Sequence, residues 1–258
     1  MNEKANLPET PVDYRQRLMQ MADAAAEKEK PDNKLISFKS GILSFNDQAA
    51  VGNKLECIIL ASVYENQFFP GPFDPNNPVS PDCWALGLDE DDMEPDPELV
   101  TEAQAEDCSD CPQNTWEKDE RGKFKAKPCK NIRRLALIEA SSLDNLKAAE
   151  IIFARLPVMS VPNWSKYVTT LRNVVQRPPA GVITVMSVVP DARSQFKVQF
   201  QFHGLIGDEY MEDLMALVDR AEDDIMFSVP KNEAPYRAAV PNPAKPANSK
   251  SKLTKAAS

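Results

Sequence analysis

The sequence contains a single histidine, His203, and only 8 glycines among its 258 residues. Because Ser/His and Cys/His mechanisms and most catalytic zinc sites need histidine, that chemistry would have to pass through this one residue. The sequence has neither the G-x-x-x-x-G-K-[ST] nor the G-x-G-x-x-G pattern of phosphate-binding glycine loops. We therefore expect a protein that is not an enzyme.

Long apolar runs are also absent. No run approaches the ~18 to 20 residues that cross a bilayer, so we expect no membrane segment. The start, Met-Asn-Glu-Lys-Ala-Asn, leads into no apolar stretch, which predicts that no secretory signal is present. Hydrophobic residues make up 42% and charged residues 27%, which is ordinary for a globular protein. A cytoplasmic location is the expectation.

The composition divides the chain into three parts. Residues 1–34 are polar and Ala-rich and predict a helical appendage, whereas residues 231–258 are rich in Pro, Ala, Lys and Ser and predict a disordered basic tail. Between them, 35–230 reads as one core domain of short strands, mainly β with helical additions. An OB-like barrel fits this pattern, and an open α+β sheet fits almost as well. The expected strands are two within Leu35–Phe45, hinged at Ser40-Gly41, then Lys54–Val63, Asn131–Ile138 (strand or short helix), Ala148–Leu156 (strand or compact apolar segment), and the hairpin pair Gly181–Val189 and Phe196–Phe202. The expected helices are Pro162–Val175 and Asp208–Phe227.

Charge is distributed unevenly along the chain. The net charge is −9, and every charged residue between Leu88 and Asp107 is acidic. Directly afterwards the sign reverses, and a local basic field of this kind can capture a polyanion despite the total charge. Solvated acidic and basic loops are the simpler interpretation of charge alone. The basic residues that we expect to contact phosphates are Lys118, Lys123, Lys125, Lys127, Lys130, Arg133 and Arg134.

Four of the five cysteines avoid apolar segments. Cys108 and Cys111 form a C-x-x-C pair, Cys83 precedes a tryptophan, and Cys129 lies in the basic stretch, whereas Cys57 lies inside an apolar strand. Four thiolates from such segments are the ligand set of a closed, structural zinc site. The sequence therefore predicts a four-cysteine zinc-binding insertion at 81–134, with the metal structural and not catalytic.

Other uses of these cysteines stay open. A redox-active C-x-x-C usually opens a helix, but here Pro112 follows the pair. Disulfides would require an oxidising compartment, which nothing in the sequence indicates. An iron–sulfur cluster could use the same four sulfurs, and His203 could replace Cys83 as a zinc ligand.

Aromatic residues accompany the basic stretch. Single-stranded nucleic acid is bound by cations along its phosphates and by aromatic rings beneath its bases. Phe124 is embedded among lysines, and each of the other aromatics is also consistent with simple burial. The stacking candidates are Tyr64, Phe69, Trp84 and Trp116.

These motifs in succession resemble a group of tailed-bacteriophage proteins. The residues concerned are Pro70-Gly-Pro-Phe73, Pro81-Asp-Cys83-Trp84, Cys108-Ser-Asp-Cys111, Cys129-Lys-Asn-Ile-Arg-Arg134 and Ser160-Val-Pro-Asn-Trp-Ser-Lys-Tyr167. The resemblance, over 35–230, is to single-stranded DNA-binding proteins with an OB-fold core and a zinc-binding insertion. It implies a non-enzymatic role in phage DNA replication or recombination, in the host bacterial cytoplasm. Many such proteins end in an acidic tail, whereas this tail is basic.

Two other classes of function remain. A zinc-stabilised protein-interaction factor, binding a host or phage protein, is favoured by the total charge and the acidic helix from Asp208. A nuclease would need carboxylates clustered around a divalent metal, but the acidic residues of this chain lie in one run. The same run, Asp89 to Asp107, is expected to lie over the basic groove when DNA is absent.

Overall fold

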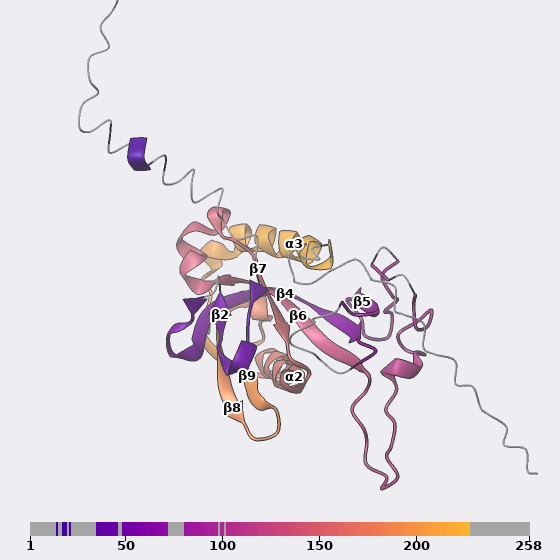
Figure 1. Cartoon of the computed structure of the whole chain (residues 1–258). Coiled ribbons are helices and arrows are strands. Elements are labelled where there is room, and N and C mark those ends of the chain that lie inside the picture. Colours follow the sequence, from indigo (N-terminus) through magenta and orange to yellow (C-terminus); the bar gives the residue numbers. More distant parts are fainter. Residues whose placement is uncertain are drawn as a thin grey trace, which may run out of the picture.

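The protein folds around one curled sheet, as the computed structural model in Figure 1 shows. The structure describes residues 35–45, 48–71, 80–97, 99–100 and 102–227, with a few helical positions between 14 and 21. The strand order is β1-β7-β6-β4-β8-β9, with β5 added beside β4, and β2 and β3 form a separate pair. This is a barrel-like α+β fold, as the sequence predicts at that level. The strands are β1 (Leu35–Ile36), β2 (Ser44–Phe45), β3 (Gln48–Ala49), β4 (Lys54–Phe68), β5 (Cys83–Gly87), β6 (Cys129–Glu139), β7 (Ile152–Leu156), β8 (Val182–Asp191) and β9 (Gln195–Leu205).

Strand β4 is the longest and organises the sheet. Its first residues pair with β8, its middle pairs with β6, and its last residues, Tyr64–Phe68, pair with both β5 and β6. A register shift between Ile59 and Ala61 is a β-bulge, which bends a strand and increases its twist. The expectation that the strand ends at Val63 is wrong, because two partner strands satisfy the backbone as far as Phe68.

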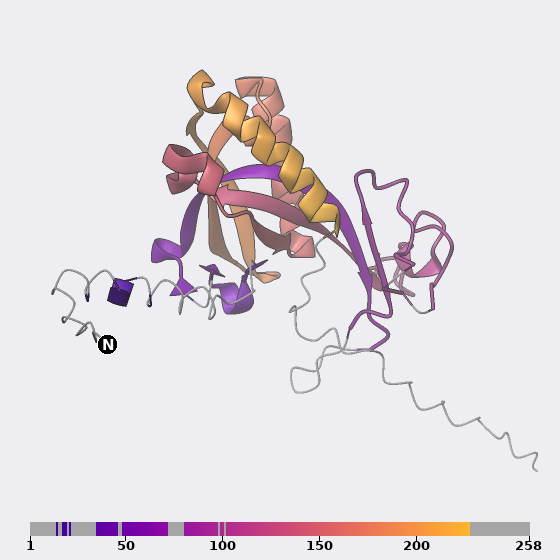
Figure 2. The same cartoon turned by 90° about the horizontal axis from the view of Figure 1, so that it is seen from above.

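Two helices pack on opposite sides of the sheet (Figures 1 and 2). Helix α2 (Val161–Thr170) continues as a π-turn to Val175 and inserts Trp164, Tyr167 and Leu171 into the core on the inner side. Helix α3 (Met211–Phe227) packs its apolar face on the other side. Buried residues at alternating positions of β4 and β6 contribute to both cores, so the sheet separates two apolar layers.

The hairpin expected near the C-terminal end of the core is confirmed. Strands β8 and β9 pair antiparallel from Val182↔Leu205 to Asp191↔Gln195. Oδ1 of Asp191 accepts hydrogen bonds from the backbone N–H groups of Arg193 and Ser194, which shapes the turn. The opposite edge of β9 is covered by α2, since Asn163 Nδ2 donates to the carbonyl of Val198 at 2.9 Å.

Both ends of the chain are described only sparsely. Leu18, Met19 and Met21 are helical and 64%, 62% and 60% exposed, which agrees with the predicted N-terminal helix at these positions. The rest of that appendage and the predicted tail 231–258 lie outside the described residues. None of the described helices has the length and apolar character needed to cross a membrane.

Candidate functional site

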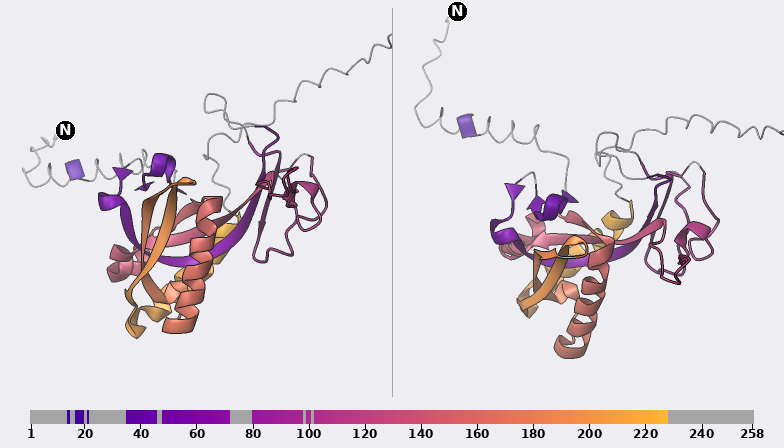
Figure 3. Two further views of the ribbon diagram at one scale, coloured as in Figure 1. Left: turned by 90° about the horizontal axis from the view of Figure 1, so that it is seen from below. Right: turned by 60° about the horizontal axis from the view of Figure 1, so that its bottom comes forward.

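The site is built on the part of β4 and β6 that extends beyond the barrel. Strand β4 lies between β5 and β6 here, and the chain from β5 to β6 forms an insertion, residues 88–128. Figures 2 and 3 show this insertion at the end of the long strands, away from α2 and α3. The barrel therefore supports the insertion through only three strands.

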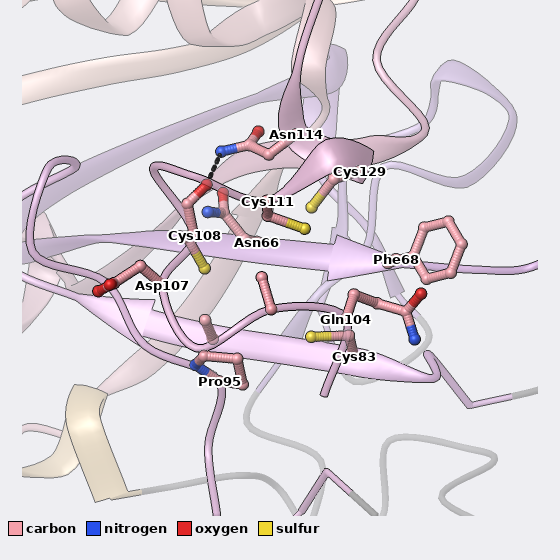
Figure 4. Close-up of a pocket in the computed structure, with 12 residues that line it drawn as sticks. Asn66, Phe68, Cys83, Pro95, Gln104, Asp107, Cys108, Cys111, Asn114 and Cys129 are labelled. Atoms are coloured by element: carbon pink, nitrogen blue, oxygen red, sulfur yellow. Dashed lines mark hydrogen bonds between the residues drawn. The ribbon is translucent and has the colours of Figure 1, made fainter. Parts of the chain in front are cut away.

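The four cysteines outside the core come together at this point. Cys83 begins β5, Cys129 begins β6, and both are paired with Phe68 of β4. Cys108 and Cys111 reach the same place from the insertion, and all four line one small pocket (Figure 4). Asn114 holds the loop in position by donating from Nδ2 to the carbonyl of Cys108 at 2.8 Å.

Two thiols of this pocket, those of Cys108 and Cys129, have a raised pKa, mainly because they are buried. Burial raises the pKa of Cys129 to about 12, with the charges of Cys108, Cys111 and Cys83 acting in the same direction. In the part of the chain that the structure describes, no group of three or more His, Cys, Asp or Glu side chains is arranged to hold a metal ion. The pocket thus gathers the predicted ligands without the geometry of a formed metal centre. His203 lies on β9 and is not among the residues that line this pocket.

A hairpin arm, residues 115–128, projects from the insertion (Figure 1). Its two sides are joined by backbone hydrogen bonds from Lys125 to Glu117 and from Asp119 to Lys123, each 2.8 Å. Asp119 Oδ1 accepts from two N–H groups of the turn, and Gly122 adopts a φ of 74°, which favours glycine. Local turn chemistry therefore defines the arm.

Two aromatic rings are displayed on this arm. Trp116 is 57% exposed and Phe124 is 66% exposed, and their ring centroids are 6.1 Å apart in an edge-to-face arrangement. Lys118 Nζ lies 5.1 Å from the centre of the Phe124 ring, and Lys127 Nζ lies 5.6 Å from that of Trp116. Phe124 is a candidate functional residue that the sequence prediction omits, although its position among lysines is the signal for it.

Further cation–aromatic pairs continue from the arm onto the strands. Lys130 Nζ lies 4.6 Å from the ring centre of Phe69, and the Arg133 guanidinium lies 3.2 Å from that of Tyr64. Tyr64 and Arg133 are opposite each other in the β4–β6 ladder, which fixes their contact. The arm and these strands together carry the predicted residues Lys118, Lys123, Lys125, Lys127, Lys130, Arg133, Tyr64, Phe69 and Trp116.

The prediction is wrong for Trp84 and Arg134, which are 2% and 1% exposed. Both side chains donate hydrogen bonds to the carboxylate of Glu65, whose side chain is fully buried. Trp84 Nε1 donates to Glu65 Oε1 at 2.8 Å, and Arg134 Nε donates to Oε2 at 3.1 Å. Arg155 of β7 pairs with the same carboxylate at 3.0 Å. Sequence alone could not show that these residues face inward, because alternation in the ladder decides it.

We predict that replacing Glu65 with glutamine (Glu65→Gln) lowers the free energy of unfolding by about 3 to 5 kcal/mol, because two guanidinium groups lose their buried countercharge. Urea unfolding followed by tryptophan fluorescence measures the loss. Glu117→Gln is the matched control, since its pair with Lys125 is exposed, and it should change stability by less than about 1 kcal/mol. Equal effects of the two variants would contradict a structural role for the buried carboxylate.

The stability that Glu65 provides should also depend on pH. Burial alone would raise its pKa, but the charges of Arg134 and Arg155 and the hydrogen bonds of Arg134 and Trp84 lower it below the ordinary value of 4.5. A depressed pKa means that this stabilisation is complete above the unfolded value and is lost as pH falls through the folded one. The stability difference between wild type and Glu65→Gln should therefore shrink on acidification below about pH 4.5. A difference that stays constant down to acid unfolding would contradict the assignment.

Comparisons of this chain with protein-family profiles, with curated proteins and with solved structures find no match. The resemblance to phage single-stranded DNA-binding proteins therefore stays a prediction from sequence motifs. The candidate site thus consists of three features: the hairpin arm, the cation–aromatic pairs of β4 and β6, and the pocket that gathers four cysteines.

Proposed function

We propose that this protein binds single-stranded DNA and catalyses no reaction. The observation that carries the proposal is the hairpin arm, where two exposed aromatic rings lie among lysines. Stacking of a base on an aromatic side chain contributes ~1 to 3 kcal/mol and tolerates any sequence. Lysines beside the rings are placed to contact the phosphates that flank a stacked base. A role in phage replication or recombination is the context that the motif resemblance suggests.

The order of the strands supports the hairpin arm as the place where DNA binds. Strands β4, β6 and β7 follow one another as antiparallel neighbours, α2 comes next, and the β8–β9 hairpin returns to pair with β4. This is the order of elements that we propose as an OB-like barrel, a fold that binds oligonucleotides on strands 2 and 3 and on the loops between strands 1 and 2 and between strands 4 and 5. In that scheme β4 is strand 1 and β6 is strand 2. The insertion and its arm then occupy the loop between them.

Structural zinc is the second part of the proposal. Two sulfurs come from strand starts held by the sheet, and two come from a C-x-x-C turn, which is the donor set of a closed tetrahedral zinc site. Bound zinc would deprotonate the thiols and connect the insertion to β5 and β6 at the foot of the arm. The four sulfurs also suit an iron–sulfur cluster, which metal analysis and absorption spectra distinguish from zinc.

A protein-interaction factor is the alternative, and the surface of α3 favours it. The helix has acidic residues in its first turn and no basic residue in its last, and Met215 on it is 51% exposed. Such a face suits a basic partner protein. A labelled oligo(dT) separates the two functions, since a factor that binds only proteins should not retain it at micromolar concentration.

We predict that the double variant Trp116→Ala/Phe124→Ala weakens binding of labelled oligo(dT) by about 2 to 6 kcal/mol at fixed salt, because two stacking rings are lost. Fluorescence anisotropy measures the affinity. Phe202→Ala is the matched control, since this ring is 39% exposed but lies on β9, away from the arm. Binding that is unchanged in the double variant and reduced in the control would place the interface elsewhere.

We predict that the purified protein contains about one zinc ion per chain. Cys129→Ser should remove the metal and lower affinity for oligo(dT), because the foot of the arm loses its anchor. The control variant Cys57→Ala should retain the metal, because the Cys57 thiol is buried in the core and does not line the pocket. Elemental analysis and anisotropy check both results. A wild type that is folded and purified without metal, yet binds oligo(dT), would overturn the zinc assignment and leave the proposed DNA binding intact.

A further inference from the structure

Three asparagine side chains form a chain of hydrogen bonds from the sheet to the foot of the arm. Asn66 on β4 and Asn131 on β6 are opposite each other in the ladder, and Asn131 Nδ2 donates to Asn66 Oδ1 at 2.5 Å. The same Nδ2 donates to Asn114 Oδ1 at 2.9 Å. Asn66 is only 5% exposed, so the chain begins in the buried part of the sheet. Asn114, which ends the short turn Pro112–Asn114, is thereby connected to two long strands.

Asn114 is also bonded to the cysteine loop. Its Nδ2 donates to the carbonyl of Cys108 at 2.8 Å, and its backbone N–H donates to the carbonyl of Cys111 at 2.9 Å. Both polar atoms of the side-chain amide therefore have partners, which fixes its orientation. The Oδ1 atom is held as an acceptor at the point where the arm begins.

Lys127 of the arm uses that acceptor. Its Nζ donates to Asn114 Oδ1 at 3.2 Å and lies 5.6 Å from the centre of the Trp116 ring. Lys127 is half-buried, whereas Lys123 at the tip of the arm is exposed. Ordering a long side chain at an interface costs about 0.5 to 1.5 kcal/mol. For Lys127 much of this ordering is already present in the free protein.

We propose that Asn114 is a positioning residue for DNA binding, which holds the Lys127 ammonium beside the Trp116 ring. A base stacked on that ring then has a cation already in place for its phosphate. An ammonium has three N–H donors, so two remain for the phosphate when Asn114 accepts from the third. Asn114 acts through Lys127 and needs no contact with DNA itself. The inference rests on the proposed DNA binding and deepens it.

Limited acetylation of the free, full-length protein, mapped by mass spectrometry, tests whether the ammonium is held. In the wild type Lys127 should react more slowly than Lys123, whose side chain has no partner among the described residues. Asn114→Ala should raise the rate at Lys127 alone by about twofold to tenfold, the effect of one hydrogen bond. Gln113→Ala, in the same turn, is the matched control and should leave both rates unchanged. Equal rates at the two lysines of the wild type would overturn the inference, whether or not Asn114→Ala folds.

A double-mutant cycle then tests the consequence for DNA. Asn114→Ala should weaken binding of labelled oligo(dT) by about twofold to tenfold with an unchanged salt dependence, because the charge of Lys127 remains but is no longer ordered. Lys127→Met should reduce the slope of log affinity against log salt by about 0.7, since one phosphate contact is lost. In the Lys127→Met background, Asn114→Ala should have no further effect.

The cycle separates this role from simple support of the cysteine loop. If Asn114 only braced Cys108, its replacement would reduce affinity equally in both backgrounds, and that result would overturn the inference while leaving DNA binding established. An unchanged salt slope in Lys127→Met would do the same. Failure of the wild type to bind oligo(dT) would overturn both the inference and the proposed function. Unchanged circular dichroism spectra verify that the variants are folded.

Discussion

A fully buried carboxylate, Glu65, connects the barrel to the candidate site. It accepts hydrogen bonds from Trp84 on β5, Arg134 on β6 and Arg155 on β7, so one side chain on β4 contacts three other strands of the sheet. A buried ion pair contributes to stability only when its geometry is satisfied, but removal of one partner is costly. This network lies where the strands leave the two apolar cores. It allows β4 and β6 to continue outward as a firm support.

The described part of the insertion beyond that network has only a small apolar cluster and is shaped by a few local interactions. The cysteine pocket joins the insertion to the starts of β5 and β6, and turn chemistry at Asp119 and Gly122 forms the arm. Apolar burial contributes little there, since the third core cluster is small. A bound metal would therefore supply the stability that a hydrophobic core supplies elsewhere. The arrangement keeps aromatic rings exposed, as a stacking surface requires.

The sequence predicts several regular elements well, because apolar residues recur with the period of a strand or helix wherever one face of that element is buried against a core. The β8–β9 hairpin, α2 and α3 are examples. The four cysteines and most of the candidate basic residues are also found together in one region, as their spacing predicts. The extension of β4 to Phe68 is missed, since it depends on pairing with two distant strands. Arg134 is misassigned for a similar reason, because in the adjacent pair Arg133-Arg134 the sequence cannot tell which side chain faces inward.

The hairpin arm and the adjoining strands form, in our proposal, the surface on which unpaired DNA lies. Ultraviolet cross-linking of the full-length protein to oligo(dT), followed by mass spectrometric mapping of the attached peptides, tests this most directly. We expect cross-links at Trp116, Phe124 and Phe69, concentrated within 115–130 and the end of β4. Cross-links confined to β9, α3 or residues 231–258, or none at all under conditions where a known single-stranded DNA-binding protein is labelled, would contradict it.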